Sequence, residues 1–223
     1  ATGGANAQTI EEVRRLIPAA RNLQSRIVTR EDLLARIYTL PNQYGRVYRA
    51  AILPNPNNPL AGTLYIICKN TAGKLVTAST TLRQNISTYL NEFRLIGDAI
   101  DILDAFVVNF KLDVEIVVEP NVNKYDVVSA VISNLKTLFK KEKIQIGMPI
   151  IESDIQAAII MTRGVLSLVS YSIACVNDSY QGRQYSSYQH DFEEKKINGM
   201  FYLDDGGIFE LRYPNSDIKV TCK

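Results

Sequence analysis

The sequence predicts an α+β fold, a mixed sheet with one long alternating strand that is covered by amphipathic helices, plus a small C-terminal β appendage. Between Phe106 and Val118 every even position is apolar, whereas most odd positions are polar. A period of two places the two sets on opposite faces of one strand. Elsewhere, segments with helical apolar spacing alternate with strand-like segments, and beyond Val176 the composition turns polar and rich in Tyr, Gln and Ser.

Two helices are expected before the first strand. Thr9 and Glu12 have the spacing of a capping box, and an apolar helical pattern continues until Pro18 interrupts it. Thr29 is expected to cap the second helix, with Asp32 in its first turn. The apolar stripe of this second helix consists of Leu33, Leu34, Ile37 and Leu40.

Two strands and a helix are expected next. Residues 46–53 and 63–69 have strand composition, and the proline- and asparagine-rich segment 54–59 between them is interpreted as a loop. Apolar residues on one face predict a helix over 81–93, whose first residue forms a capping box with Gln84.

After the long strand, the pattern predicts two more helices and another strand. Residues 124–141 have a strongly amphipathic helical pattern. A shorter helix is expected to begin at Ser153, with Gln156 as its capping partner, and to end near Gly164 in a left-handed cap. Residues 165–176 are rich in β-branched and aromatic side chains and predict a strand. This order of elements predicts a single sheet covered by helices.

The last part of the chain is expected to be β-rich. Residues 177–196 are interpreted as a long loop, and the segments on either side of 204–207 as a hairpin. A final strand is expected over 218–221. The predicted organisation is an N-terminal linker and helical arm, one or more α/β domains and a C-terminal appendage, over 1–28, 29–177 and 178–223. The abrupt start of the chain reads as an inter-domain linker with residues missing upstream.

The composition excludes several functional classes. The chain has 223 residues, 46% of them apolar and 22% charged, which is ordinary for a globular protein. A net charge of +2 is too small to indicate a nucleic-acid or anionic-membrane surface. No apolar run approaches the ~20 residues of a membrane span, and we recognise no signal peptide. The three cysteines lie far apart, which predicts free thiols in a reducing compartment.

No catalytic, cofactor-binding or metal-binding constellation is found in the sequence. The single histidine, His190, has no identifiable nucleophile and is interpreted as a solvated loop residue. Three carboxylates at intervals of three residues are interpreted as turn-capping groups and not as metal ligands: Asp98, Asp101 and Asp104. Three tyrosines are assigned to an interaction loop or mobile surface loop, a reading preferred to base stacking: Tyr180, Tyr185 and Tyr188. The sequence therefore predicts a protein that is not an enzyme.

Several segments occur in a recognisable order over roughly residues 9–175. A charged helix over 11–15 precedes residues 26–33, Arg-Ile-Val-Thr-Arg-Glu-Asp-Leu, and the Tyr89-Leu90 helix with its basic segment comes later. The long strand, the amphipathic helix, 146–150 and 163–165 then follow. In this order the segments resemble the baseplate J-like family, the baseplate wedge proteins of contractile-tailed bacteriophages. Residues 26–33 are similar to the family's Arg-x-Val-Thr-x-x-Asp motif, although Leu33 stands where many relatives carry an aromatic residue.

This resemblance implies a structural subunit of the virion, assembled in the host cytoplasm. It implies association with other copies, expected as a dimer within a ring, and with other wedge subunits around the tail tube, where the ring couples host contact to sheath contraction. No cofactor, nucleic acid, membrane or small-molecule substrate is implied. We expect a partner interface, or alternatively a fold-back onto the protein's own sheet, for Ile10, Val13, Leu16 and Ile17.

Three other classes remain open from the sequence. A ferredoxin-like nucleic-acid-binding module would bind with a steep dependence on salt. An enzyme of unrecognised type would have a polar cleft with perturbed titrating groups. Another viral structural component, such as a connector protein, would differ from a wedge protein in its place within the particle.

Overall fold

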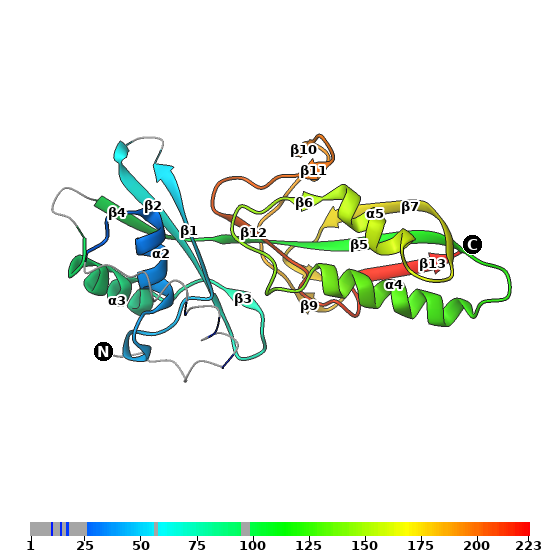
Figure 1. Cartoon of the computed structure of the whole chain (residues 1–223), viewed down its shortest axis with the longest axis horizontal. Helices are drawn as coiled ribbons and strands as arrows, with labels where there is room; N and C mark the ends of the chain where they lie inside the picture. The colour runs from blue at the N-terminus through cyan, green and yellow to red at the C-terminus, as the bar shows by residue number, and fades with distance from the viewer. Residues whose placement is uncertain (1–9, 11–13, 15–16, 18–25, 56–57, 95–98) are drawn as a thin grey trace. The chain divides into compact units, whose positions relative to one another are not determined.

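The computed structural model describes residues 10, 14, 17, 26–55, 58–94 and 99–223. The chain divides into two compact units, Ala1–Phe106 and Val107–Lys223. Both units combine helices with β-strands, so the predicted α+β class is confirmed (Figure 1). The division falls within the segment 29–177, for which the sequence predicts one or more α/β domains.

Unit 1 is a four-stranded sheet with β2 at its centre. Strand β2 pairs antiparallel with β1 and β3 and parallel with β4. The elements of this unit are α2 (Arg30–Tyr38), η1 (Asn42–Tyr44), β1 (Arg49–Asn55), β2 (Asn58–Lys69), β3 (Leu75–Val76), α3 (Thr80–Asn91) and β4 (Ala99–Asp104).

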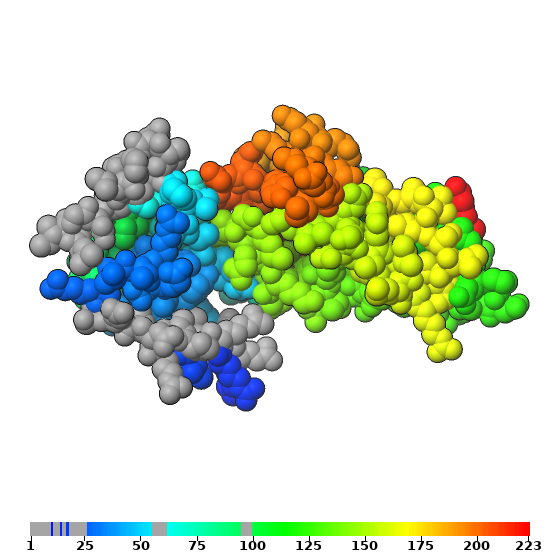
Figure 2. Space-filling model, turned by 45° about the horizontal axis from the view of Figure 1, so that its top comes forward, coloured from blue at the N-terminus to red at the C-terminus, as the bar shows by residue number. Residues whose placement is uncertain are grey.

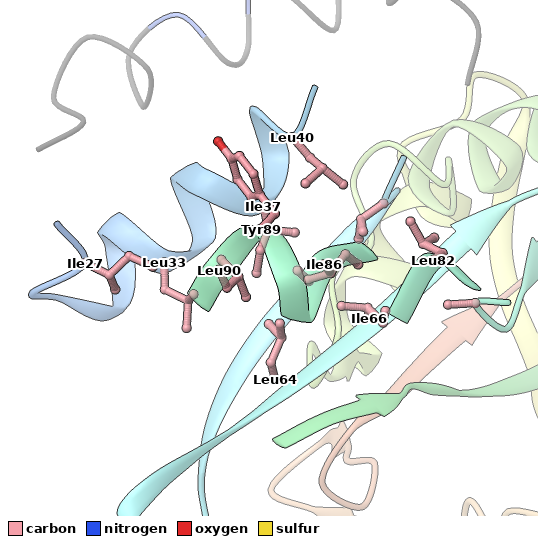
Figure 3. Close-up of a cluster of buried hydrophobic side chains, with 13 residues drawn as sticks. Ile27, Leu33, Ile37, Leu40, Leu64, Ile66, Leu82, Ile86, Tyr89 and Leu90 are labelled. Atoms are coloured by element: carbon pink, nitrogen blue, oxygen red, sulfur yellow. The ribbon is translucent and has the colours of Figure 1, made fainter. Parts of the chain in front are cut away.

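The core of unit 1 lies between helices α2 and α3 and the sheet. Helix α2 contributes Leu33 and Ile37, and β2 contributes Leu64 and Ile66, all nearly or fully buried. In Figure 3 these side chains meet those of α3, with Ile86 in the same cluster. Burial of large aliphatic side chains is the dominant favourable term in folding, which explains why both helices are amphipathic.

The ends of the unit 1 elements differ in part from the predictions. The cap of α2 is confirmed: the Thr29 hydroxyl accepts a hydrogen bond from the Asp32 N–H, and the Asp32 carboxylate accepts one from the Thr29 N–H. The capping box predicted at the start of α3 is wrong, because Ser79 caps this helix through a bond from Leu82 N–H.

The loop predicted over 54–59 is shorter than expected. Strand β1 runs to Asn55 and β2 begins at Asn58, with a register shift between Pro54 and Asn55. Proline lacks an N–H donor and is tolerated on edge strands and at bulges. Strand β1 is an edge strand in this sheet, so Pro54 does not end it.

Unit 2 is built around β5, which has neighbours on both of its edges. Strand β13 pairs parallel with β5 and β7 pairs antiparallel with it, while β12 also joins this sheet. The elements are β5 (Phe106–Val118), α4 (Lys124–Leu138), β6 (Ile150–Ile151), α5 (Glu152–Ile160), β7 (Val165–Cys175), β8 (Ser179–Tyr180), β9 (Arg183–Gln184), β10 (Lys196–Ile197), β11 (Met200–Phe201), β12 (Gly207–Glu210) and β13 (Ile218–Cys222).

The bounds of β5 are those predicted from its alternating pattern. Its even positions from 108 to 118 are buried, and Leu112 and Ile116 are fully buried. Helices α4 and α5 lie alongside this sheet in Figure 1, with α4 in contact with β13 and α5 with β7. The alternation has two exceptions among the odd positions: Val107 and Asn109 are buried as well.

The helices of unit 2 form where they were expected, with different ends. Helix α4 buries Val127, Val131 and Leu135, as its amphipathic pattern requires. The capping box predicted at Ser153 is wrong, because α5 begins at Glu152 without a side-chain cap.

Gly164 lies beyond the end of α5 and not at its cap. Its φ is +91°, as predicted for a left-handed residue. A Cβ atom at this position would lie 2.8 Å from the Val127 side chain, so the close approach of this turn to α4 also requires glycine.

The C-terminal segment forms part of the main sheet of unit 2. The hairpin predicted around 204–207 is wrong, because β11 pairs with β10 and β6 whereas β12 pairs with β5. The prediction of a single sheet is also wrong, since β4 and β5 belong to different sheets. Local turn signals gave no information on these pairings, which join segments about 100 residues apart, as in the β13–β5 register Val220↔Val114.

Candidate functional site

Two of the four residues predicted to contact a partner are described by the structure, and both are exposed. Ile10 and Ile17 are helical, with 73% and 54% of their surface exposed. Val13 and Leu16 lie outside the described residues. Exposure of two large aliphatic side chains is compatible with the predicted partner interface.

A larger group of exposed apolar side chains lies at one end of unit 2. Tyr125 and Met161 are each 85% exposed, and Val122, Ile160 and Leu166 are also exposed. The turn after β5 and the segment after α5 are held together by a bond from Glu119 N–H to the Gly164 carbonyl. Figure 2 shows green and yellow atoms of these two segments side by side at this end. Exposed apolar side chains on neighbouring segments are typical of protein interaction sites.

A hollow of about 680 Å³ lies along the end of β7. We call it the β7 hollow. Its lining comprises Ile173, Ala174 and Cys175 of β7, Asn177, the segment 189–195 and Asp204. Four carboxylates (Asp191, Glu193, Glu194, Asp204) and one ammonium (Lys195) line it, which leaves a net charge of −3. Because Lys195 is bound to Asp204 at 2.8 Å, the hollow presents excess negative charge to solvent.

His190 is not the solvated loop residue that the sequence suggested. It is only 9% exposed, and its ring packs edge-on against Phe192 and Phe209, with centroid distances of 4.8 and 5.7 Å. Its Nε2 atom is buried without a hydrogen-bond partner among the described residues. Desolvation by this aromatic cluster lowers the pKa of His190 below its usual 6.5, against the opposing effect of Asp204.

Unit 2 is expected to lose stability as the pH falls below about 6.5. The depressed pKa means that the unfolded chain binds a proton on His190 in a window where the folded chain does not. The stabilisation is therefore complete above the unfolded pKa of about 6.5 and declines as the pH falls toward the folded pKa. Urea unfolding at a series of pH values between about 5 and 7.5 measures this slope. Because His190 is the only histidine, the variant His190→Phe should flatten the slope, and an unchanged slope would contradict the assignment.

A buried ionic cluster, centred on Glu210 of β12, was not predicted from the sequence. Glu210 is 0% exposed, and its carboxylate binds Lys141 Nζ at 2.6 Å and Arg212 Nη1 at 3.1 Å. Asn109 of β5 donates its amide to the same carboxylate at 3.1 Å and accepts a bond from Ser186 N–H at 2.7 Å. The period-two pattern had placed Asn109 on the polar face, but its amide fixes β12 and the segment at 186 to the sheet.

Part of the tyrosine-rich segment is fixed inside the fold and is not a mobile loop. Tyr185 is buried, and its hydroxyl donates a bond to Asp217 Oδ1 at 2.7 Å. Burial and the Asp217 carboxylate together raise the pKa of Tyr185. Asp217 also accepts a bond from Tyr213 N–H at 2.8 Å, so these groups stabilise the approach to β13. Tyr180 stays partly exposed.

The acidic triplet is not a set of turn caps, because Asp101 and Asp104 lie within β4. Asp98 lies outside the described residues. Asp104 accepts bonds from Arg83 at 2.9 Å and from Ala78 N–H at 3.1 Å, which fixes the start of α3 to the sheet.

Within the described ranges, no group of three or more His, Cys, Asp or Glu side chains is placed to hold a metal ion. No helix in that part of the chain has the length and apolarity to span a bilayer.

The three cysteines are free thiols, as predicted: Cys68, Cys175 and Cys222. Burial raises the pKa of the Cys68 thiol to about 11. A thiol with so high a pKa is almost entirely protonated at neutral pH and is a poor nucleophile.

Comparison with known proteins gives a likeness in fold. No protein-family model matches the sequence, and no curated protein matches it. Among solved structures, the chain is similar to a chain of the anti-feeding prophage (AFP) baseplate, determined by cryo-EM with six-fold symmetry, with a TM-score of 0.50 and 10% identity. The likeness covers 78% of this chain and 39% of the AFP chain, so this chain spans well under half the length of its structural neighbour. The two chains therefore share a fold over most of the length of this one.

Proposed function

We propose that this protein is a structural subunit of the baseplate of a contractile phage tail or a related particle. The observation that carries the proposal is the likeness in fold, over 78% of the chain, to a chain of the AFP baseplate. The order of motifs that resembles the baseplate J-like family is an independent argument for the same role. The proposed role has no catalytic step.

In this role the chain assembles with itself and with other wedge subunits into a ring around the tail tube. The ring couples host contact to sheath contraction. Two features support an assembly role: the exposed Ile10 and Ile17, and the apolar end of unit 2 with Tyr125 and Met161. Each unit has its own buried core, which suits a component that must keep its shape when neighbours change position.

Removal of the gene from its source should abolish baseplates. We expect electron microscopy of the resulting lysate to reveal free tubes and sheaths without assembled tails. Complementation with the intact gene should restore whole particles. Particles with normal baseplates in the deletion strain would contradict the proposed function.

Charged substitutions at the N-terminal helix should weaken assembly without unfolding the protein. Ile10→Asp with Ile17→Asp places two carboxylates where we propose that a partner chain packs, and desolvation of a charge is costly. Light scattering of the purified protein is expected to give a smaller mass for this double variant. Ile197→Asp, at an exposed apolar position of β10 that belongs to neither proposed assembly surface, is a matched control for charge on an apolar surface. An unchanged, folded oligomer in the double variant would rule against the role of this helix.

A further inference from the structure

We propose that the outer edge of β7, together with the β7 hollow, binds an extended strand from a neighbouring subunit of a different kind, and that the side chains of this strand include Lys or Arg. The neighbour would add this strand to the sheet of unit 2. The inference rests on the proposed function only in naming another subunit of the same particle as the source of the strand.

Strand β7 has the properties of an open edge. Among the described strands it pairs with β5 alone, over the register from Phe110↔Cys175 to Val118↔Val165. Its residues, Val-Leu-Ser-Leu-Val-Ser-Tyr-Ser-Ile-Ala-Cys, include no charge and no proline. Natural proteins usually protect a long edge strand with charged residues or proline. Without them, the unpaired N–H and C=O groups of the edge pair with another chain. Strand addition at a free edge is a common mode of peptide recognition.

The hollow lies along this edge. Successive residues of a strand point to opposite faces, yet the three consecutive residues 173–175 all line the hollow. Their inner edge is occupied by the partners 110–112 of β5. A space that contacts all three residues therefore lies beside the outer edge of β7, where an added strand would run.

The segment 189–195, which forms the wall of the hollow opposite β7, determines which charge the bound strand carries. The exposed carboxylates of Glu193 and Glu194 stand on this wall, in a lining with a net charge of −3. Complementary charge favours a cationic partner and disfavours an acidic one. His190 belongs to the same wall.

The test uses a synthetic eight-residue peptide that alternates Lys and Val, with an alternating Glu and Val peptide as its counterpart. We expect fluorescence anisotropy with the full chain to give at least about tenfold tighter binding of the Lys peptide at low salt. Hydrogen exchange of residues 165–175 should slow on binding, because strand addition protects edge amides, whereas adsorption by charge alone would not.

The charge reversal Glu194→Lys should weaken binding of the Lys peptide several-fold, and Glu119→Lys, an exposed reversal elsewhere in unit 2, should leave it within about twofold. Equal binding of the two peptides, or unchanged exchange in β7, would overturn the proposal. If the chain dimerised through β7 and Glu194→Lys dissociated that dimer, the occupant would be a second copy, and the proposal would also be wrong. Peptide binding can fail while the deletion test still succeeds, so the two proposals are separable.

Discussion

Replacement of Glu210 by Gln is expected to lower the free energy of unfolding of unit 2 by about 3–5 kcal/mol. The carboxylate is fully buried, and the side chains of its cationic partners are only 19% (Lys141) and 15% (Arg212) exposed. Gln keeps the shape of the side chain and removes its charge. Two largely desolvated cations would then lose their compensating anion, which is the costly way to break a buried pair.

Urea unfolding of the full chain, followed by circular dichroism, measures this effect. The matched control is Asp204→Asn. The Lys195–Asp204 pair, at 2.8 Å, lies between the two Glu210 pairs in length, but its side chains are 39% (Lys195) and 48% (Asp204) exposed. Loss of an exposed pair should cost less than about 1 kcal/mol. If the free energy of unfolding of the Glu210→Gln variant lay within about 1 kcal/mol of that of the parent protein, the buried cluster would not be a stabilising centre of unit 2.

Truncation of Phe110 to Ala should destabilise unit 2 by a similar amount, about 3–5 kcal/mol. Phe110 is fully buried in β5, and its ring meets three others edge-on: Phe139 at 5.0 Å, Phe209 at 6.0 Å and Phe192 at 6.3 Å. The substitution removes the ring that α4, β12 and the 189–195 segment share. A cavity would remain, because close-packed interiors relax only in part.

Tyr125→Ala removes a ring of similar size from an exposed position, and we expect a change within about 0.5 kcal/mol. Thermal unfolding of the two variants and of the parent chain compares their melting temperatures. Equal melting temperatures for Phe110→Ala and the parent would mean that the aromatic cluster does not stabilise the fold.

Local signals in the sequence predicted local structure well. The period-two pattern gave both ends of β5, and the predicted Thr29 cap gave the start of α2. Such features depend on side chains a few residues apart, so the sequence alone contains them. Even here neighbouring candidates compete, as at α3, where Ser79 caps the helix two residues before the expected Thr81.

Pairings between distant segments could not be predicted in this way. Nothing near Asn109 indicates that its amide will meet Glu210, about a hundred residues later, inside a closed core. The burial of His190, which lies outside any strand, likewise depends on Phe209 of β12. The exposed apolar end of unit 2 was missed for the same reason, because the turn after β5 and the segment after α5 meet only in the folded chain, where Glu119 N–H binds the Gly164 carbonyl.

The most direct test of the proposed baseplate role is a cryo-EM map of the particle that contains this chain. We predict that unit 1 and unit 2 will fit as separate bodies into repeated density of a ring around the tail tube, with Ile10 and Ile17 at a contact with another chain. Density for the chain outside the baseplate, or no density for it in the particle, would contradict the account.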